Sequence, residues 1–355
     1  MKFSVSRDAL HEALALTNRA ASGGFDVIEV AASSNGVVTL CGSSGNVTLS
    51  YDVPAKVGTA GTVMVPGKFM QQVVSSVPSS EVSVELGKGA LSVSGGPSAF
   101  SVRTLSQAVI AKVSSPDTDP VSVSGDLVTA LSQVGIAASK SSSASPATTG
   151  VLLTAANGVV ECAATDSYRV AVRSLEASAL PVDAKALIPA NVVELLNRLM
   201  AKRGGVTVRF GPISASFESA GVVLATQLIN APFPAYQKVI PAREGTIASV
   251  SRDVLVDSLQ RARLVNDSRV AVLLTADGIT LSSTSAENDC YTEPTACAVT
   301  GEEVSFVVNP MYILDGLRAA PSTMVDIVCG ASTKPVLIQG EADDSYRYVV
   351  MPVRM

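Results

Sequence analysis

Apolar residues recur at helical spacing after three prolines that lie about 120 positions apart, Pro66, Pro189 and Pro310. The third, fourth and seventh residues after each proline are apolar, which is the stripe that an amphipathic helix buries. Proline suits the first turn of a helix because its missing N–H would be unpaired there. The apolar positions are Phe69, Met70 and Val73, then Val192, Val193 and Leu196, then Ile313, Leu314 and Leu317. The pattern predicts one helix after each proline.

A short segment also recurs three times, and each occurrence opens another amphipathic stretch. Residues 4–8 read Ser-Val-Ser-Arg-Asp, residues 122–126 read Ser-Val-Ser-Gly-Asp, and residues 249–253 repeat the first version. The second serine fits a helix N-cap, and the aspartate fits the first turn, where a carboxylate complements the helix dipole. The predicted inner faces are Leu10 and Leu14, Leu127 and Leu131, and Leu255 and Leu259.

Turns and alternating runs lie between the two predicted helices of each copy. The dipeptides Asn35-Gly36, Asn157-Gly158 and Asp277-Gly278 are flanked by apolar residues and supply the positive φ angles of tight hairpins. Runs rich in Val and Thr alternate between apolar and polar side chains, as at Val206-Thr207-Val208-Arg209, and predict strands. Each copy therefore reads as a two-helix plus β-sheet domain of the α+β class.

These landmarks keep the same order in every copy, so the chain is one unit written three times. A period of about 120 residues matches a whole globular domain rather than a solenoid repeat. The predicted domains are 1–115, 120–243 and 244–355. Of the 355 residues, 47% are hydrophobic, so each third can bury a core of its own.

The sequence carries no sign of secretion or of a membrane span. Met1-Lys2-Phe3 leads directly into the first unit without a signal peptide, and no apolar run is long enough to cross a bilayer. The cysteines are odd in number and contain no CxxC pair, which favours buried thiols in a reducing compartment. They are Cys41, Cys162, Cys290, Cys297 and Cys329. We expect a cytoplasmic protein.

No catalytic or metal-binding arrangement emerges from the sequence. His11 is the only histidine and lies on the charged side of the first predicted helix, as a solvated residue would. The Gly-rich residues 94–97 and 202–205 lack the lysine-hydroxyl pair of a P-loop and the GxGxxG spacing, so they indicate turns. The acidic pairs Glu302-Glu303 and Asp343-Asp344 fit solvated loops better than a metal site. We expect a protein that is not an enzyme and needs no cofactor or metal.

Three segments carry a resemblance to a known family. They are Ala-Thr-Asp-Ser-Tyr-Arg-Val-Ala-Val at 164–172, Phe-Pro-Ala-Tyr-Gln-Lys-Val-Ile-Pro at 233–241 and Tyr-Val-Val-Met-Pro-Val-Arg-Met at 348–355. With the triple repeat, they make the chain resemble a short, divergent bacterial β sliding clamp, the processivity ring of the replicative DNA polymerase. The resemblance implies the DNA clamp fold and a head-to-tail homodimer that forms a six-domain ring. It also implies a function, which is to encircle double-stranded DNA without reading its sequence and to tether the replicative polymerase, the clamp loader and other proteins with a clamp-binding motif.

The same resemblance implies two protein contact sites. A pocket for partner peptides is expected from residues in all three segments, and apolar side chains flanked by a few polar groups suit an extended peptide with hydrophobic anchors. The implied pocket residues are Thr165, Ser167, Tyr168, Arg169, Val170, Pro234, Lys238, Val239, Val349, Met351, Pro352, Val353 and Arg354. The implied dimer interface contains Phe100, Val102, Arg263 and Leu264.

The net charge of −5 is compatible with a DNA partner if the basic residues lie on one surface. A ring that slides should not grip its substrate, since each neutralised phosphate adds salt-dependent affinity. The basic residues that are expected to face DNA inside the ring fall on or beside predicted helices. Aromatic residues do not alternate with them, so the sequence gives no indication of base stacking. They are Arg19, Lys68, Lys140, Arg198, Lys202, Arg203, Arg252 and Arg318.

Two departures from the family pattern motivate an alternative function. Residues 23–26 run directly into Val27, where the family has a further strand after the first helix, and Arg263 is charged at an interface position that is otherwise apolar. The alternative is a ring-deficient paralogue that keeps the peptide pocket and sequesters clamp-binding proteins.

Overall fold

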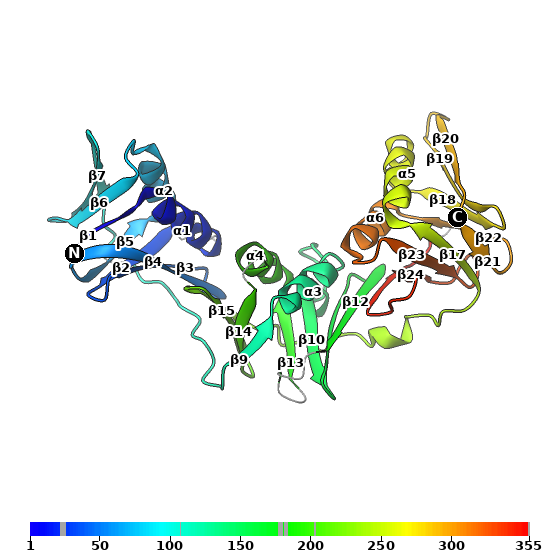
Figure 1. The fold of residues 1–355 in the computed structure, drawn as a ribbon, viewed down its shortest axis with the longest axis horizontal. Helices are drawn as coiled ribbons and strands as arrows, with labels where there is room; N and C mark the ends of the chain where they lie inside the picture. The colour runs from blue at the N-terminus through cyan, green and yellow to red at the C-terminus, as the bar shows by residue number, and fades with distance from the viewer. Residues whose placement is uncertain (22–25, 107, 177–179, 181–183, 202–203, 354–355) are drawn as a thin grey trace. The chain divides into compact units, whose positions relative to one another are not determined.

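The computed structural model describes residues 1–21, 26–106, 108–176, 180, 184–201 and 204–353 (Figure 1). Its contacts divide the chain into two compact units, each of which combines helices with antiparallel sheet. The first comprises Met1–Gly125 and Arg198–Leu228, and the second comprises Asp126–Asn197 and Ile229–Met355. The predicted α+β class is confirmed. The middle sequence copy contributes to both units, so the units do not follow the three predicted domain boundaries.

The first unit is built on a 12-stranded sheet. Its strands are β1 (Lys2–Ser6), β2 (Val27–Ser33), β3 (Val37–Ser43), β4 (Val47–Thr59), β5 (Gly61–Pro66), β6 (Glu81–Leu86), β7 (Ala90–Gly95), β8 (Ser98–Arg103), β9 (Val121–Ser124), β14 (Gly205–Phe210), β15 (Ser214–Ser219) and β16 (Val222–Gln227). The main path runs β8-β7-β6-β1-β4-β16-β15-β14-β9, and β3, β2 and β5 branch from β4. Strand β8 therefore forms one end of this path.

Two helices of the first unit, α1 (Arg7–Ala20) and α2 (Gly67–Ser76), pack on this sheet and on each other. Ser6 caps α1 as predicted, because its side chain accepts a hydrogen bond from the backbone N–H of Ala9 at 3.5 Å. Met70 of α2 is buried as predicted. The prediction for Phe69 is wrong, because 47% of this residue is exposed although its counterparts Val192 and Ile313 are buried.

The second unit holds a 9-stranded and a 4-stranded sheet. The strands of the larger sheet are β10 (Gly150–Ala156), β11 (Val159–Thr165), β12 (Arg169–Glu176), β13 (Lys185–Pro189), β17 (Thr246–Ser251), β21 (Ala298–Thr300), β23 (Met324–Cys329), β24 (Val336–Gly340) and β25 (Tyr346–Val350). They follow the order β13-β10-β11-β12-β25-β24-β23-β17-β21. The smaller sheet has β18 (Val270–Thr275), β19 (Gly278–Thr284), β20 (Cys290–Thr295) and β22 (Val304–Val308), and β20 is one of its edges.

Four further helices complete the pattern of two helices per copy. They are α3 (Asp126–Gly135), α4 (Ala190–Met200), α5 (Arg252–Val265) and α6 (Pro310–Ala319), with short 3₁₀ turns at Pro146–Thr149 and Tyr236–Lys238. Helix α6 begins at Pro310, and the side chain of Asn309 caps it by accepting a hydrogen bond from the N–H of Met311 at 2.9 Å. Ser251 precedes α5 but forms no such side-chain bond. The helices that the prolines and the repeated serines predict are therefore present.

Neighbouring sequence copies are joined by strand pairing. The third strand after the first helix of one copy pairs antiparallel with the last strand of the next copy, as β4 with β16 and β12 with β25. Leu49 thus lies opposite Leu224, and Ala171 lies opposite Tyr348. Such pairings join residues far apart in the sequence, so local patterns alone do not determine them.

The cysteines differ in environment. All five are free thiols, and Cys41, Cys162 and Cys329 are buried as predicted. The prediction is wrong for Cys290, which is exposed because it begins the edge strand β20. No helix among the described residues is long and apolar enough to cross a membrane.

Candidate functional site

A cavity of about 130 Å³ in the second unit brings together three segments that are distant in the sequence. Its wall is formed by the β11–β12 turn, by the residues around the 3₁₀ turn at Tyr236–Lys238 and by the end of β25. The lining residues are Thr165, Ser167, Arg169, Val170, Pro234, Ala235, Tyr236, Val239, Val349 and Met351. An engineered apolar cavity of ~150 Å³ binds one benzene, so this cavity has room for one aliphatic or aromatic side chain.

The β11–β12 turn is held by its own side chains. The Asp166 carboxylate accepts hydrogen bonds from the backbone N–H groups of Tyr168 at 3.0 Å and Arg169 at 3.1 Å. The Thr165 hydroxyl accepts from the N–H of Ser167 at 3.1 Å and donates to the carbonyl of Arg169 at 2.7 Å. Ser167 has a φ of 77°, in the left-handed region that favours glycine. The turn therefore places a strained serine in the cavity wall.

Arg169 is the charged centre of this wall, and only 9% of its side chain is exposed. Its Nε donates to Asp166 at 2.9 Å, and its Nη1 donates to Asp315 at 2.6 Å and to the Tyr348 hydroxyl at 3.3 Å. The guanidinium carbon lies 4.5 Å from the centre of the Tyr312 ring, within cation–π range. Burial acts to lower the pKa of Arg169, but Tyr348, Asp315 and Asp166 outweigh it and raise that pKa. The guanidinium is therefore charged.

The part of the wall around the 3₁₀ turn at Tyr236–Lys238 is held in place by the buried side chain of Tyr236. Tyr236 is 4% exposed, packs edge to face on Phe233 at 5.7 Å between ring centres, and its hydroxyl donates a hydrogen bond to Glu161. Glu161 also accepts from Arg347 at 3.0 Å. Burial and Glu161 both raise the pKa of Tyr236, which keeps its hydroxyl a donor. At the rim, the N–H of Met351 bonds the carbonyl of Tyr168 at 2.9 Å, which continues the β12–β25 pairing by one step.

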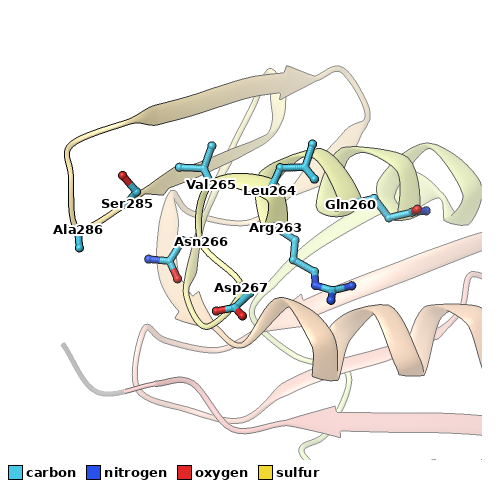
Figure 2. A pocket seen from close by; sticks show the side chains of 8 residues that line it. All are labelled: Gln260, Arg263, Leu264, Val265, Asn266, Asp267, Ser285 and Ala286. Atoms are coloured by element: carbon cyan, nitrogen blue, oxygen red, sulfur yellow. The ribbon is translucent and has the colours of Figure 1, made fainter.

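A second hollow, of about 720 Å³, lies in the same unit at the C-terminal end of α5 (Figure 2). Helix residues Arg263 and Leu264 form one side, and Ser285 and Ala286 from the loop between β19 and β20 form another. Leu264 is 86% exposed. This exposed leucine and the strand β20, which has one neighbour among the described strands, lie at the same end of the unit.

Models of one protein family match the chain along nearly its whole length. The N-terminal, central and C-terminal domains of the DNA polymerase III beta subunit match residues 1–113, 123–235 and 237–354. The chain belongs to the DNA polymerase III beta subunit family. The expectation of a divergent bacterial β sliding clamp with the clamp fold is thereby confirmed.

Individual relatives are similar to this chain over all or nearly all of their length. The beta sliding clamp of Streptomyces coelicolor is 27% identical over 375 residues, with 100% of both chains covered. The beta sliding clamp homolog GriR of Streptomyces muensis is also 27% identical and covers 100% of this chain and 99% of its own. The crystal structure of the Bacillus subtilis DNA polymerase sliding clamp has a TM-score of 0.92 at 21% identity, with 100% of this chain and 99% of that chain covered. At that identity, the structural match supports the fold alone.

The structure brings eight of the thirteen predicted pocket residues into the cavity wall. Four others lie outside it for identifiable reasons. Tyr168 is 62% exposed and stacks on Tyr312, with 6.2 Å between ring centres. Lys238 is exposed on its 3₁₀ turn, and Pro352 and Val353 are absent from the cavity wall, where the N–H of Val353 donates instead to the carbonyl of Val307 at 2.8 Å. Arg354 lies outside the described residues.

Two wall residues were not predicted, Ala235 and Tyr236, although both lie inside the segment 233–241 that carries the family resemblance. Neither Tyr312 nor Asp315, which contact Arg169, was predicted. Both occupy partly exposed positions of α6, where polar side chains give no sequence signal beyond that of a solvated helix face.

The predicted dimer residues lie in contrasting environments. Phe100 is partly buried on β8, whereas Val102 is fully buried in the core of the first unit. Side chains along β8 point alternately to the two faces of the sheet, so Phe100 and Val102 both face the helices of the first copy. The strand presents its backbone at the edge of the sheet. Within the single chain, Phe100 is thus the more exposed of the two residues.

The predicted DNA-contacting residues are not equivalent in the structure. Arg252 donates to Asp253 at 2.8 Å and to the carbonyl of Ala320 at the end of α6 at 3.0 Å, so its guanidinium is committed to the fold. Lys140 forms an exposed ion pair with Glu194 at 3.7 Å, which contributes little to stability. The remaining described candidates lie on helices and are exposed, namely Arg19, Lys68, Arg198 and Arg318. Lys202 and Arg203 lie outside the described residues.

Ser167→Gly is expected to raise the free energy of unfolding by about 1 kcal/mol. An L-residue in the left-handed region costs about 1–2 kcal/mol, and the greater freedom of glycine in the unfolded chain offsets part of that gain. Urea denaturation of the two proteins measures the difference. Asn288→Gly, at a φ of 69°, is a matched control with a smaller expected gain, because asparagine tolerates this region. A loss of stability in Ser167→Gly would mean that the serine side chain itself holds the turn.

Glu293 on β20 is partly exposed and is hydrogen-bonded by donors from α5 and from its own strand. It accepts from Arg261 at 2.7 and 2.8 Å, from Ser258 at 2.8 Å and from the Tyr291 hydroxyl. These hydrogen bonds, led by that of Arg261, lower the pKa of Glu293 to about 2. Arg261 is thereby occupied within the fold.

A depressed carboxyl pKa predicts a defined pH dependence. The stabilisation by ionised Glu293 is complete above the ordinary glutamate pKa of about 4.3 and disappears as the pH falls toward 2. Glu293→Gln should therefore be less stable than the wild type from pH 5 to 7, and the difference should shrink between pH 4.3 and pH 2. Urea unfolding of both proteins across this range tests the prediction. A difference that stays constant down to pH 2 would contradict it.

Proposed function

We propose that this sliding clamp closes as a head-to-tail homodimer around duplex DNA and tethers the replicative polymerase without catalysing a reaction. The pairing rule between copies supports closure. The third strand after the first helix of each copy pairs with the last strand of the next, and β20 of the third copy and β8 of the first are left without such a partner among the described strands. A second chain supplies both partners, and a head-to-tail contact that closes gives a ring rather than a filament.

The two strand pairs that join copies within one chain, β4 with β16 and β12 with β25, also predict which residues of β20 and β8 lie opposite each other between two chains. At both junctions the same positions meet. Leu49 pairs with the sixth residue of β3 on one side and with Leu224, the third residue of β16, on the other. Ala171 pairs in the same way with the sixth residue of β11 and with Tyr348, the third residue of β25. The corresponding residues at the open ends are Tyr291, partner of the sixth residue of β19, and Phe100, the third residue of β8. Phe100 therefore faces Tyr291 of the second copy, and aromatic cross-strand pairs are stabilising.

Two features of the open ends agree with this register. Pro294 cannot donate to a neighbouring strand, and the register places it opposite Pro97, just beyond the end of β8. Phe69 is exposed only in the first copy, whereas Val192 and Ile313 at the same position of the other copies are buried. A second chain against α2 would cover the phenylalanine in the same way.

The charge distribution supports a sliding contact with DNA rather than a tight one. The chain carries a net charge of −5, and exposed basic residues such as Lys68, Arg198 and Arg318 lie on helices. Weak positive charge toward the phosphates permits sliding, while the acidic remainder repels DNA elsewhere. We place the protein in the cytoplasm with the replication machinery.

The cavity beside Arg169 is the proposed docking site for the polymerase, the clamp loader and other proteins with a short motif. It accepts one apolar side chain, and Met351 at its rim can adapt to different partners. Exposed Val239 and Tyr168 extend the apolar surface beyond the cavity. An extended peptide with hydrophobic anchors at alternate positions matches this arrangement.

The solution mass and DNA retention together test the proposal. Sedimentation equilibrium at micromolar concentration is expected to give two chains per particle. After loading by the clamp loader, the protein should stay on nicked circular DNA and leave once that DNA is linearised, because the link is topological. A monomer that is never retained would contradict the ring and favour the ring-deficient, sequestering alternative.

A further inference from the structure

Asp315 contacts the candidate pocket only through Arg169. It lies on α6 in the third copy, whereas Arg169 begins β12 in the second copy, and the two side chains meet at 2.6 Å. Asp315 is absent from the lining of the cavity, and 32% of its side chain is exposed. The one hydrogen bond of its side chain among the described residues is to Arg169. A residue outside the wall thus contacts the buried charged group within it.

The surrounding contacts leave Arg169 little freedom while this bond is present. Asp166 holds Nε, Asp315 and Tyr348 share Nη1, and the Tyr312 ring lies against the guanidinium. The Tyr348 hydroxyl in turn donates to the carbonyl of Tyr312 at 2.8 Å. Of these groups, Asp166 belongs to the same turn as Arg169, and the other three belong to the third copy. The position of one wall residue is therefore set largely by a neighbouring copy.

We propose that Asp315 is a positioning residue for the partner pocket. We further propose that it couples partner binding to the seam between the second and third copies, which is the paired strands β12 and β25 together with the contacts of α6 to Arg169. The inference rests on the proposed function of the pocket. Asp315 holds the Arg169 guanidinium so that its side chain completes the wall before a partner arrives. Without it, only Asp166, Tyr348 and the Tyr312 ring hold the guanidinium, so the partner must restrict the arginine further on binding, which weakens affinity. By linkage, a bound partner also strengthens the seam that positions the arginine.

Asp315 is a better probe of this coupling than Asp166. The Asp166 carboxylate also accepts two backbone N–H groups of the turn, so its removal would change the wall directly. Asp315→Asn keeps the shape of the side chain and removes only the charge of the pair. A charge-assisted hydrogen bond is worth about ten-fold or more in an equilibrium, so affinity for the partner should fall roughly ten-fold.

The experiment compares full-length clamps for binding to the DNA polymerase III catalytic subunit of the same organism by surface plasmon resonance. Asp257→Asn on α5 is the matched control, since it makes the same charge change at an exposed site away from the cavity. The expected result is about ten-fold weaker binding for Asp315→Asn, unchanged binding for Asp257→Asn and partial recovery in Asp315→Glu. If Asp315→Asn does not fold, the comparison of Asp315→Glu with the wild type replaces it, with weaker binding again expected.

A second measurement separates positioning from a purely structural role. In the wild type, saturating polymerase subunit should slow hydrogen exchange of the β12 and β25 amides, and in Asp315→Asn at equal saturation this protection should be smaller while the free proteins exchange alike. Equal affinity, or a loss that matches only a larger unfolded fraction, overturns the inference. If the wild-type clamp itself does not bind the polymerase subunit, the proposed function of the pocket fails as well, and that result is distinct from the other two.

Discussion

Replacing Leu264 by aspartate is expected to convert the clamp from a dimer to a monomer at micromolar concentration while the protomer stays folded. Leu264 is 86% exposed, so a charge there costs the single chain little. In the proposed contact, the residue lies beside the edge strand β20, where a second copy would bury it. Burying an unpaired carboxylate costs several kcal/mol, which corresponds to at least about 100-fold in the dimer dissociation constant.

Sedimentation equilibrium across a concentration series measures this change, and retention on nicked circular DNA should be lost in parallel. Ile213→Asp provides the matched control, because Ile213 is 75% exposed in the loop between β14 and β15, and several strands separate these two from β8 in the sheet order. The control should remain a dimer with wild-type stability. A Leu264→Asp protein that keeps the dimer mass would place the contact elsewhere and leave β8 and β20 without an assigned partner.

Local patterns predicted the helices well because the signals are local. A proline or a capping serine followed by apolar residues at helical spacing needs no distant partner to be recognised. The exposure of Phe69 departs from the pattern, since its counterparts are buried and the phenylalanine is not. Periodicity identifies an apolar face, but it does not reveal whether that face is covered by the same chain or by another one.

Arg252 illustrates the opposite limit. A basic residue at the start of a helix is compatible with a DNA contact, but here the guanidinium reaches the carbonyl of Ala320 at the end of another helix. Arg7 does the same in the first copy, where it donates to the carbonyl of Val77 at 3.3 Å. The arginine of the Arg-Asp dipeptide in the first and third copies thus joins the two helices of its copy, a contact that the local sequence does not reveal.

The pocket could be predicted only through the family resemblance. Its wall combines residues near positions 167, 236 and 350, and no periodicity connects them. The three segments meet because β12 pairs with β25 and because the 3₁₀ turn folds onto that sheet, which are non-local contacts. The resemblance named segments rather than side-chain directions, and therefore Lys238 was included and Tyr236 was missed.

Deleting residues 351–355 is expected to abolish binding of the replicative polymerase while the fold is retained. Met351 forms part of the cavity rim, whereas the last core position of the strand, Val350, stays in place. The deletion removes the backbone bonds of Met351 to Tyr168 and of Val353 to Val307, so the free energy of unfolding should fall by only about 1–2 kcal/mol. Loss of the apolar rim should weaken binding by at least about 100-fold, the effect of removing an interface hot spot.

A shorter deletion of Arg354 and Met355 is the control that separates the rim from the extreme terminus. If Met351 is the anchor, this shorter deletion keeps most of the affinity, and surface plasmon resonance with the polymerase subunit distinguishes the two proteins directly. If instead the shorter deletion alone abolishes binding, the anchor is Arg354 or Met355 rather than the cavity rim. Wild-type affinity in the longer deletion would mean that the polymerase docks on another surface of the clamp, since the cavity would then have lost Met351 from its rim without effect.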